Sequence, residues 1–380
     1  MLTLKAPTVV TGTDVLHDAA VVVDDRGRIA DVGPAGSRPT TVALPDGLLV
    51  PGFVEAQVNG GVGVDLMSAD AEGWRRHARW LASTGVTSYC PTLVSAPVPT
   101  LAERAAVARE VAAADDPLAA RLLGLHCEGP FLTRAGAHSP EHLKEPTPER
   151  VRELVAATRD VLAVVTLAPE LPGALDAIAL LAGLGVVVSV GHSDARADQV
   201  ARAADAGATF VTHLFNAQSG LHHREPGVVG EALTDPRLTV GLIADHEHVH
   251  PTACRLALGA AAGRVALVTD AVAAAGMPPG RYPLGDQVTM IEAGRAPRLS
   301  DGTLAGSGLT MPVALRNAVS DGYSAVAAVE AATRVPADLL GRPDLGRICP
   351  EAWGDLVWLA DDLTVRAVWK AGRPVVPASR

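Results

Sequence analysis

The sequence has no cluster of lysine or arginine residues, and its 42 acidic residues outnumber its 32 basic ones. With a formal net charge of −10 at pH 7, the chain is a poor candidate for binding nucleic acid or an anionic membrane surface. It also lacks a long apolar run: the longest, residues 177–190, contains two glycines and is shorter than the roughly 20 residues that span a membrane. Residues 1–11 have no basic region, apolar stretch and cleavage site in succession, so we expect a cytoplasmic protein.

Cysteine is scarce as well. The four residues, Cys90, Cys127, Cys254 and Cys349, form no Cys-x-x-Cys pair. This spacing predicts reduced thiols in or near the core. What the chain does have is a hydrophobic share of 48% against 19% charged residues over its 380 positions, which argues for a folded protein with a large core.

Strand-like and helical patterns alternate through the middle of the chain. Helical patterns cover 71–83, 101–114 and 195–206. Eight β-branched apolar runs lie at 48–53, 85–92, 121–128, 161–169, 186–192, 208–215, 239–245 and 265–271. Such alternation predicts an α/β fold with parallel strands and right-handed crossovers. Eight strands predict a (β/α)8 TIM-like barrel, whose chemistry lies on loops at the C-terminal strand ends.

The two ends of the chain follow a different pattern. Residues 9–32 and 356–376 each contain apolar runs interrupted by turn residues, which is typical of hairpins. We predict a small β-sandwich domain built from 1–50 together with 345–380, joined to a barrel at 51–344. The Gly- and Pro-rich stretch 276–306 interrupts the barrel pattern and is interpreted as an insertion with hairpin character.

Four of the predicted barrel strands end in a single polar residue: Glu128, His192, His213 and Asp270. These ends meet on one face of a barrel, so we expect the four side chains to converge. One carboxylate and two imidazoles can hold a divalent ion with a position open for water. Asp270 could be a further ligand or a base for that water. His126 could be a ligand, but we favour a role beside the ligands.

The neighbours of these residues form short motifs that follow one another along most of the chain. They are Pro-Gly-Phe-Val-Glu-Ala-Gln-Val-Asn-Gly, His-Cys-Glu-Gly-Pro-Phe, Gly-His-Ser-Asp-Ala, Thr-His-Leu-Phe-Asn-Ala, His-Arg-Glu-Pro-Gly, Thr-Asp-Ala and Leu-Ala-Gly-Ser, beginning at residues 51, 126, 191, 212, 223, 269 and 304. In these motifs and their order the chain resembles the N-acetylglucosamine-6-phosphate deacetylases of the amidohydrolase superfamily.

The resemblance implies a metal-dependent hydrolase. The expected reaction converts N-acetyl-D-glucosamine 6-phosphate to D-glucosamine 6-phosphate and acetate, in amino-sugar catabolism and cell-wall recycling. Glu128, His192 and His213 match the family's metal ligands, and Asp270 matches its catalytic acid and base.

The resemblance also bears on the number of metal ions. Many amidohydrolases carry His-x-His after the first barrel strand and hold a second metal there, whereas this chain has Gln57 and Asn59. Amide side chains are poor ligands for a second transition metal, so we expect one divalent ion per subunit. Zinc is the first choice, with iron, manganese and cobalt as alternatives.

Further positions match the family's substrate contacts. They are Ala137, His138, Asn216, Ala217, Arg224, His248, Leu304, Ala305 and Gly306. The forked donors of Arg224 suit a phosphate, and the backbone N–H groups of Asn216 and Ala217 could bind the same group. The family is commonly dimeric with this arginine reaching across the interface, which implies a homodimer. His246 stands where the family generally has glycine.

Two other classes of function remain open from the sequence. The chain could be an amidohydrolase for another amide, such as N-acetylgalactosamine 6-phosphate, an N-acyl amino acid or a cyclic ureide. It could also be a non-catalytic scaffold that binds a sugar phosphate or a protein. The three expected metal ligands and the expected acid and base are all present, which favours an enzyme.

Overall fold

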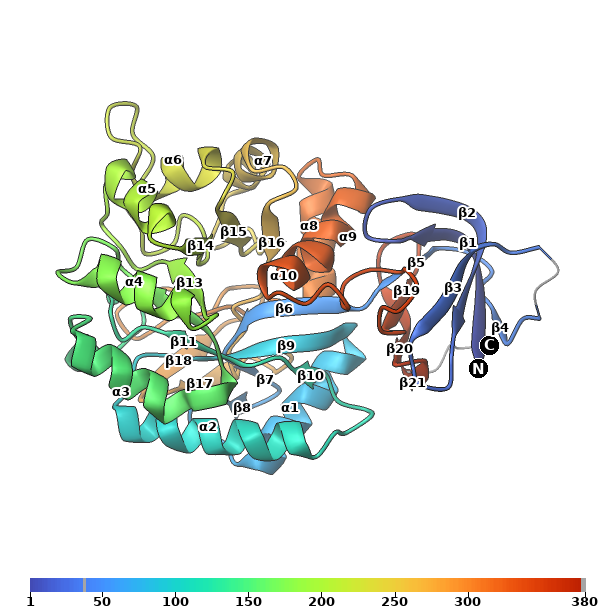
Figure 1. Cartoon of the computed structure of the whole chain (residues 1–380), viewed down its shortest axis with the longest axis horizontal. Coiled ribbons are helices and arrows are strands. Elements are labelled where there is room, and N and C mark those ends of the chain that lie inside the picture. The colour runs from blue at the N-terminus through green and yellow to red at the C-terminus, as the bar shows by residue number, and fades with distance from the viewer. Residues whose placement is uncertain (37–38, 377–380) are drawn as a thin grey trace.

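The computed structural model describes residues 1–36 and 39–376 and has two parts (Figure 1). A barrel of parallel strands surrounded by helices occupies the left of the view, and a β sheet built from both chain ends lies at the right. The predicted α/β barrel with a small β domain from both termini is confirmed. Of the predicted β domain, residues 37–38 and 377–380 lie outside the described residues.

The barrel strands pair in sequence order, each parallel to the next, from β6 through β9 and β11 to β16. Nearly all their residues are buried, as expected for parallel strands covered on both faces. The strands are β6 (Phe53–Val58), β9 (Val86–Leu93), β10 (Arg121–Leu122), β11 (Leu125–Glu128), β12 (Leu162–Leu167), β13 (Val187–Val190), β14 (Ala208–Val211), β15 (Thr239–Leu242) and β16 (Val265–Leu267).

The first predicted barrel strand, 48–53, is wrong in position. Its residues divide between β5 (Leu48–Pro51), which belongs to the terminal sheet, and the start of β6. The break falls at Gly52, where a Cβ atom would lie 2.2 Å from the Thr87 hydroxyl oxygen. The chain changes from one sheet to the other at this glycine. The first barrel strand is therefore Phe53–Val58, with Gln57 as its penultimate residue and Asn59 directly after it.

Helices cover the outside of the barrel. Helix α1 begins where the Asp70 carboxylate accepts the Gly73 N–H at 2.8 Å, and it buries Trp74, Ala78 and Leu81 on one face. The helices are α1 (Ala71–Ser83), α2 (Val98–Ala113), α3 (Pro148–Thr158), α4 (Ala174–Gly183), α5 (Ala197–Asp205), α6 (Gly227–Thr234), α7 (Pro251–Ala260), α8 (Met311–Ser320), α9 (Ala325–Ala332) and α10 (Arg334–Leu339), with single 3-10 turns at Pro140–His142 and Arg159–Val161. All three predicted helices are confirmed.

The barrel closes between its first and last strands through a side chain as well as the backbone. Asp270 N–H donates to the Gln57 carbonyl at 3.0 Å. The fully buried Glu55 carboxylate accepts the N–H groups of Gln57 at 3.0 Å and Thr269 at 3.1 Å. This seam places the ends of β6 and β16 side by side, so Gln57 reaches Asp270.

Both chain ends contribute to the β domain, whose strands join in the order β21-β20-β19-β5-β1-β2-β3, with β4 paired to β1 beside this path, and pack on an apolar core of their own. The predicted hairpins are present: β2 and β3 flank the turn at 24–27, and β19, β20 and β21 meander antiparallel. The strands are β1 (Leu2–Val10), β2 (Val15–Val23), β3 (Ile29–Pro34), β4 (Val42–Ala43), β5, β19 (Leu356–Leu359), β20 (Val365–Lys370) and β21 (Arg373–Val376).

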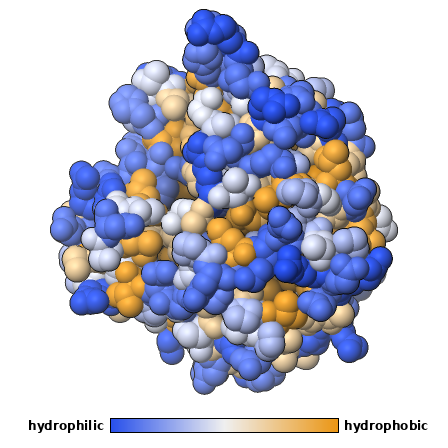
Figure 2. All heavy atoms as spheres, turned by 90° about the vertical axis from the view of Figure 1, so that its left-hand side faces the viewer, coloured by the Kyte–Doolittle hydropathy of each residue, from blue (hydrophilic) through white to orange (hydrophobic). Residues whose placement is uncertain are grey.

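Two short hairpins lie outside these sheets. The strands β7 (Gly60–Gly61) and β8 (Val64–Asp65) follow β6. The predicted insertion is confirmed as a hairpin of β17 (Gly280–Leu284) and β18 (Gln287–Ile291). All four cysteines are free, three of them buried. Within the described residues, no helix is both long and apolar enough to cross a membrane, and the face in Figure 2 is largely hydrophilic with scattered apolar patches.

Candidate active site

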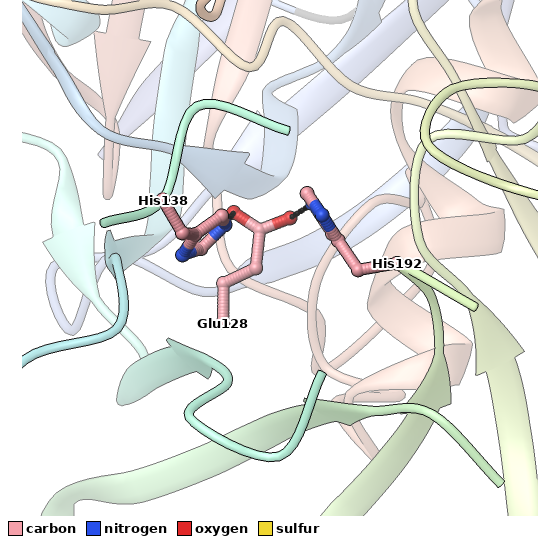
Figure 3. Close-up of side chains that lie close together, drawn as sticks. All are labelled: Glu128, His138 and His192. Atoms are coloured by element: carbon pink, nitrogen blue, oxygen red, sulfur yellow. Dashed lines mark ion pairs between the residues drawn. The ribbon is translucent and has the colours of Figure 1, made fainter. Parts of the chain in front are cut away.

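Three predicted ligands form a compact group at the C-terminal ends of barrel strands. Glu128 is the last residue of β11, and His192 and His213 each follow a strand by two residues. The His192 and His213 Nε2 atoms lie 3.2 and 2.9 Å from Glu128 Oε1 and 3.1 Å from each other. All three side chains are buried. Figure 3 shows Glu128 between His192 and a further histidine, His138, whose Nε2 is 3.8 Å from Glu128 Oε2.

The orientation of the donor atoms fits a divalent ion. His192 Nδ1 lies 2.8 Å from the Arg134 carbonyl oxygen, which can only accept, so Nδ1 carries the proton. In the neutral ring Nε2 then presents a lone pair to the group, the arrangement typical of a metal-bound histidine. Two imidazole nitrogens and one carboxylate oxygen match the ligand preferences of zinc and similar metals.

Electrostatics within this group are strongly coupled. Burial opposes the ionisation of Glu128, but the hydrogen bonds that His192 and His213 donate when their Nε2 atoms carry protons outweigh it and hold the pKa of this carboxyl well below its usual range. A divalent ion would take the place of these Nε2 protons. Burial likewise opposes charge on His213, yet the Glu128 carboxylate raises the pKa of that imidazole. The buried carboxylate thus stays ionised and available to a cation.

Several of the converging residues have unusual backbone conformations. His192, His213 and Asp270 have φ values of +48°, +26° and +50°, in a region that residues with a Cβ rarely adopt. Such strain persists where surrounding packing enforces it, and it gathers at functional sites. Gly191 permits the close approach here, because a Cβ at this position would lie 2.8 Å from the Thr166 side chain.

Asp270 lies beside the ligand group and is held by two amides. Its Oδ1 accepts the Asn59 Nδ2–H at 2.7 Å and the Gln57 Nε2–H at 3.2 Å, while Gln57 Nε2 is also 3.2 Å from Glu128 Oε1. Burial, with the nearby Glu128 charge, raises the pKa of Asp270 to about 6. A carboxyl group that titrates near neutrality suits proton transfer in both directions.

His138 is a buried donor facing the same space. Its Nδ1 accepts the Ser95 backbone N–H at 3.0 Å, so the proton of the neutral ring sits on Nε2. Burial lowers the pKa of His138 to about 3, with the neighbouring His192 charge adding to the effect. The ring therefore stays neutral and offers one N–H to a group above Glu128.

His126 points away from the ligand atoms. Its Nδ1 is 3.2 Å from the Thr92 hydroxyl and its Nε2 is 2.7 Å from the Thr166 hydroxyl. Thr166, Thr212 and Ser189 continue this chain of hydroxyl contacts across the barrel interior. The ring belongs to a polar layer of the barrel interior, because both of its nitrogens are engaged by threonine hydroxyls rather than by the proposed ligands.

A cavity of about 280 Å³ opens over these groups. The predicted residues that line it are Asn59, Glu128, Ala137, His138, His192, His213, Asn216, Ala217, His248, Asp270, Leu304 and Gly306. The cavity lining also includes Val94, Gly136, Val272, Leu284 and Thr303, which the sequence did not single out. Leu284 belongs to the insertion hairpin, and only the position of that hairpin over the barrel mouth brings it here.

Four predicted positions lie away from the lining. Gln57 and His126 are fully buried beneath it, and Ala305 is fully buried within its turn. Arg224 is exposed in the loop between β14 and α6 and does not line the cavity, and its guanidinium lies 3.0 Å from the His223 ring nitrogen Nε2. This loop projects from the barrel between α5 and α6 (Figure 1). Arg224 therefore does not reach the cavity of its own chain.

His246 adopts the left-handed conformation that glycine adopts freely, with a φ of +65°. Its Nε2 is 2.9 Å from the Asp321 carboxylate, a contact that stabilises the loop. Two residues on, His248 keeps its place through Asp245, which accepts the His248 backbone N–H at 2.8 Å and lies 2.7 Å from Nδ1. The loop thus supports a cavity-facing His248 without a glycine at 246.

Comparison with known proteins agrees with this geometry. A model of the amidohydrolase family matches residues 48–375. An N-acetylgalactosamine-6-phosphate deacetylase of Escherichia coli O157:H7 is 40% identical, covering 92% of this chain and 94% of the relative. An N-acetylglucosamine-6-phosphate deacetylase of Vibrio furnissii is 36% identical, covering 99% of this chain and 95% of the relative.

Solved structures give the same result. A mutant N-acetyl-D-glucosamine-6-phosphate deacetylase of Mycobacterium smegmatis, in complex with N-acetyl-D-glucosamine 6-phosphate, has a TM-score of 0.93 at 37% identity, with 99% of both chains covered. The Thermotoga maritima enzyme has a TM-score of 0.89 at 32% identity, covering 98% of this chain and 99% of the other. The family model matches most of the chain, and the similar sequences and structures cover nearly all of it, so this chain belongs to the amidohydrolase family.

Proposed function

We propose that this protein is an N-acetylglucosamine-6-phosphate deacetylase, which hydrolyses N-acetyl-D-glucosamine 6-phosphate to D-glucosamine 6-phosphate and acetate. The observation that carries the proposal is the group of Glu128, His192 and His213 with Asp270 beside it, at the floor of a cavity in the barrel mouth. The relatives that act on phosphorylated N-acetyl amino sugars match nearly the whole chain, which supports this substrate class.

Glu128 Oε1 and the Nε2 atoms of His192 and His213 would hold one divalent ion, zinc being our first choice. When bound, such an ion polarises the acetyl carbonyl and lowers the pKa of water from about 15.7 toward 7. Gln57 and Asn59 place amide donors, rather than further ligands, next to Asp270. This arrangement supports one ion per chain.

Asp270 moves the protons. Its Oδ1 is occupied by the amide N–H groups of Gln57 and Asn59, so Oδ2 is the oxygen that takes a proton from the attacking water. The same oxygen then gives the proton to the sugar nitrogen, because an amine leaves readily only once protonated. The His138 Nε2–H donates to the oxygen that becomes negative in the transition state.

The phosphate is held farther out. Asn216 and Ala217 line the cavity. The Asn216 N–H donates to the His213 carbonyl at 3.0 Å, so of the two predicted backbone donors we assign the phosphate contact to the Ala217 N–H. Arg224 is exposed and does not line the cavity of its own chain, and we infer that it completes the phosphate site of the second subunit in a homodimer. Barrel residues 51–344 would carry the reaction, and the terminal β domain would support them. A cytoplasmic location is part of the same proposal.

The galactosamine isomer is the second candidate substrate, because a relative 40% identical over 92% of the chain is a deacetylase of N-acetylgalactosamine 6-phosphate. The deciding experiment loads the metal-free protein with zinc, iron, manganese or cobalt. Acetate release is then measured from both 6-phosphates and from unphosphorylated N-acetylglucosamine. We expect the glucosamine 6-phosphate to be hydrolysed with the highest kcat/KM. No acetate from either 6-phosphate with any metal would overturn the proposal.

Arg224→Ala tests the phosphate contact. We expect the KM for the 6-phosphate to rise by about tenfold or more, since a charged hydrogen bond contributes roughly 1.5–3 kcal/mol. Hydrolysis of the unphosphorylated sugar would be unaffected. Arg196→Ala, which removes an exposed arginine paired with Asp198, is the matched control. An unchanged KM in Arg224→Ala would remove this residue from the site.

A further inference from the structure

The insertion hairpin is hydrogen-bonded to the loop that follows β11. Asp286, in the turn between β17 and β18, accepts the Ser139 hydroxyl at 2.6 Å. Gln287 Nε2–H donates to the same Ser139 oxygen at 2.8 Å, and His142 Nε2 lies 3.3 Å from the Asp286 carboxylate. Ser139 and Asp286 are 147 positions apart, so this contact joins two segments that otherwise leave the barrel separately.

The fastened loop carries a residue of the proposed mechanism. Ser139 directly follows His138, and both are buried. A residue whose neighbour is anchored has little freedom to move its own backbone, so the Ser139 contact limits where the His138 ring can lie. On the hairpin side, the turn is held to the β7–β8 hairpin by the Gly285 N–H, which donates to the Asp65 carboxylate at 3.3 Å.

The part of the insertion that follows the hairpin has a second set of contacts, with Glu247, and these are weaker. Arg295 and Arg298 lie 3.5 and 3.6 Å from the Glu247 carboxylate, and the arginine side chains are 56% and 38% exposed. Exposed ion pairs of this kind contribute little. The short hydrogen bond from a buried serine to a carboxylate is the stronger type, so the main attachment lies on the His138 side.

We propose that Ser139, His142 and Asp286 form a latch that fastens the β17–β18 hairpin to the His138 loop and thereby positions His138 at the cavity. These are positioning residues, and their effect on catalysis rests on the proposed function. Because Leu284, which lines the cavity, ends β17 just before the latched turn, the latch also sets how the hairpin covers the substrate.

Asp286→Ala tests the latch through two measurements on the metal-loaded full-length protein. We expect kcat for the 6-phosphate to fall by about tenfold with a smaller change in KM, since small displacements of a catalytic group reduce turnover steeply. We also expect faster amide hydrogen exchange in residues 133–143, with exchange in the distant strands β13 and β14 unchanged. Asp286→Asn keeps an oxygen that accepts the Ser139 hydroxyl and should restore most of both properties.

The controls separate the latch from other effects. Glu292→Ala removes an exposed acid from the same insertion and should behave as wild type. If Asp286→Ala does not fold, Ser139→Ala removes the same hydrogen bond from the other side. Wild-type exchange in residues 133–143 of either variant would overturn the latch, whatever its kcat. An inactive wild type would overturn the proposed function instead, and the exchange rates would still decide whether the latch exists.

Discussion

Replacing Asn59 with Asp reverses the polarity of the contact that holds the proposed acid and base. In the structure Asn59 Nδ2–H donates to Asp270 Oδ1 at 2.7 Å. The substitution Asn59→Asp is nearly isosteric, so packing around the buried side chain is preserved. It replaces the amide N–H donor with a second carboxylate oxygen beside Asp270. Burial already raises the pKa of Asp270 to about 6.

The size of the effect follows from the geometry. Two unit charges about 4 Å apart repel by about 4 kcal/mol at an effective dielectric constant near 20, which corresponds to about three pKa units at about 1.4 kcal/mol each. The two carboxyl groups would then share one proton through neutral pH.

We therefore expect kcat at pH 7 to fall by about 100-fold or more, within the range that general acid–base catalysis contributes. The acid limb of the kcat profile should move up by about three pH units. The assay is acetate release from N-acetylglucosamine 6-phosphate between pH 5 and 10, with the metal content of each preparation measured by elemental analysis.

Asn59→Ala is the matched control, because it removes the hydrogen bond without adding a charge. Its kcat should lie between those of wild type and Asn59→Asp, with the acid limb moved less. Equal metal content and a kcat for Asn59→Asp at or above that of Asn59→Ala would refute the electrostatic reasoning.

Three further predictions test other parts of the structure. His213→Ala should lose most of its bound metal and its activity while the fold persists, as seen by elemental analysis and circular dichroism; retention of a full equivalent of metal would contradict the ligand assignment. Burial raises the pKa of Glu55 from 4.5 to about 8, so the folded state keeps a proton that the unfolded chain releases, and wild-type stability falls as pH rises between these values. The Tm of Glu55→Gln minus that of wild type should consequently increase as the pH rises from 5 to 8. A Tm difference that stays constant over this range would contradict the raised pKa of Glu55. Trp74→Ala empties a fully buried site in α1 and should cost about 3–5 kcal/mol in urea denaturation; a loss below about 1 kcal/mol would mean that the site collapses around the gap.

The sequence was informative wherever a local pattern carries the structure. Continuous β-branched apolar runs located seven of the eight barrel strands, helical patterns located the three predicted helices, and the prediction 71–83 matches α1 residue for residue. The first strand was misplaced because one apolar run, interrupted only by Gly52, serves two sheets. No local pattern separates these two partners, since sheet membership depends on residues far along the chain.

The residue types of the site were equally clear from the sequence. An acid or a histidine at the end of an apolar strand can be identified by eye, and barrel topology requires such ends to meet. The catalytic and ligand roles of Glu128, His192, His213 and Asp270 remain predictions, now with measured distances between the groups that would perform them.

By itself, then, the sequence determined the barrel class, the terminal β domain, the hairpin insertion and the four polar side chains at the strand ends. Each of these is indicated by a pattern of residues that are close together in the sequence. Only the tertiary structure decided that amides at the end of the first strand hold Asp270, that the hairpin bonds to the loop after β11 through Asp286, and that Arg224 is absent from the lining of its own cavity. Those features depend on which distant segments pack together, and packing is settled by the burial and hydrogen bonding of the whole chain.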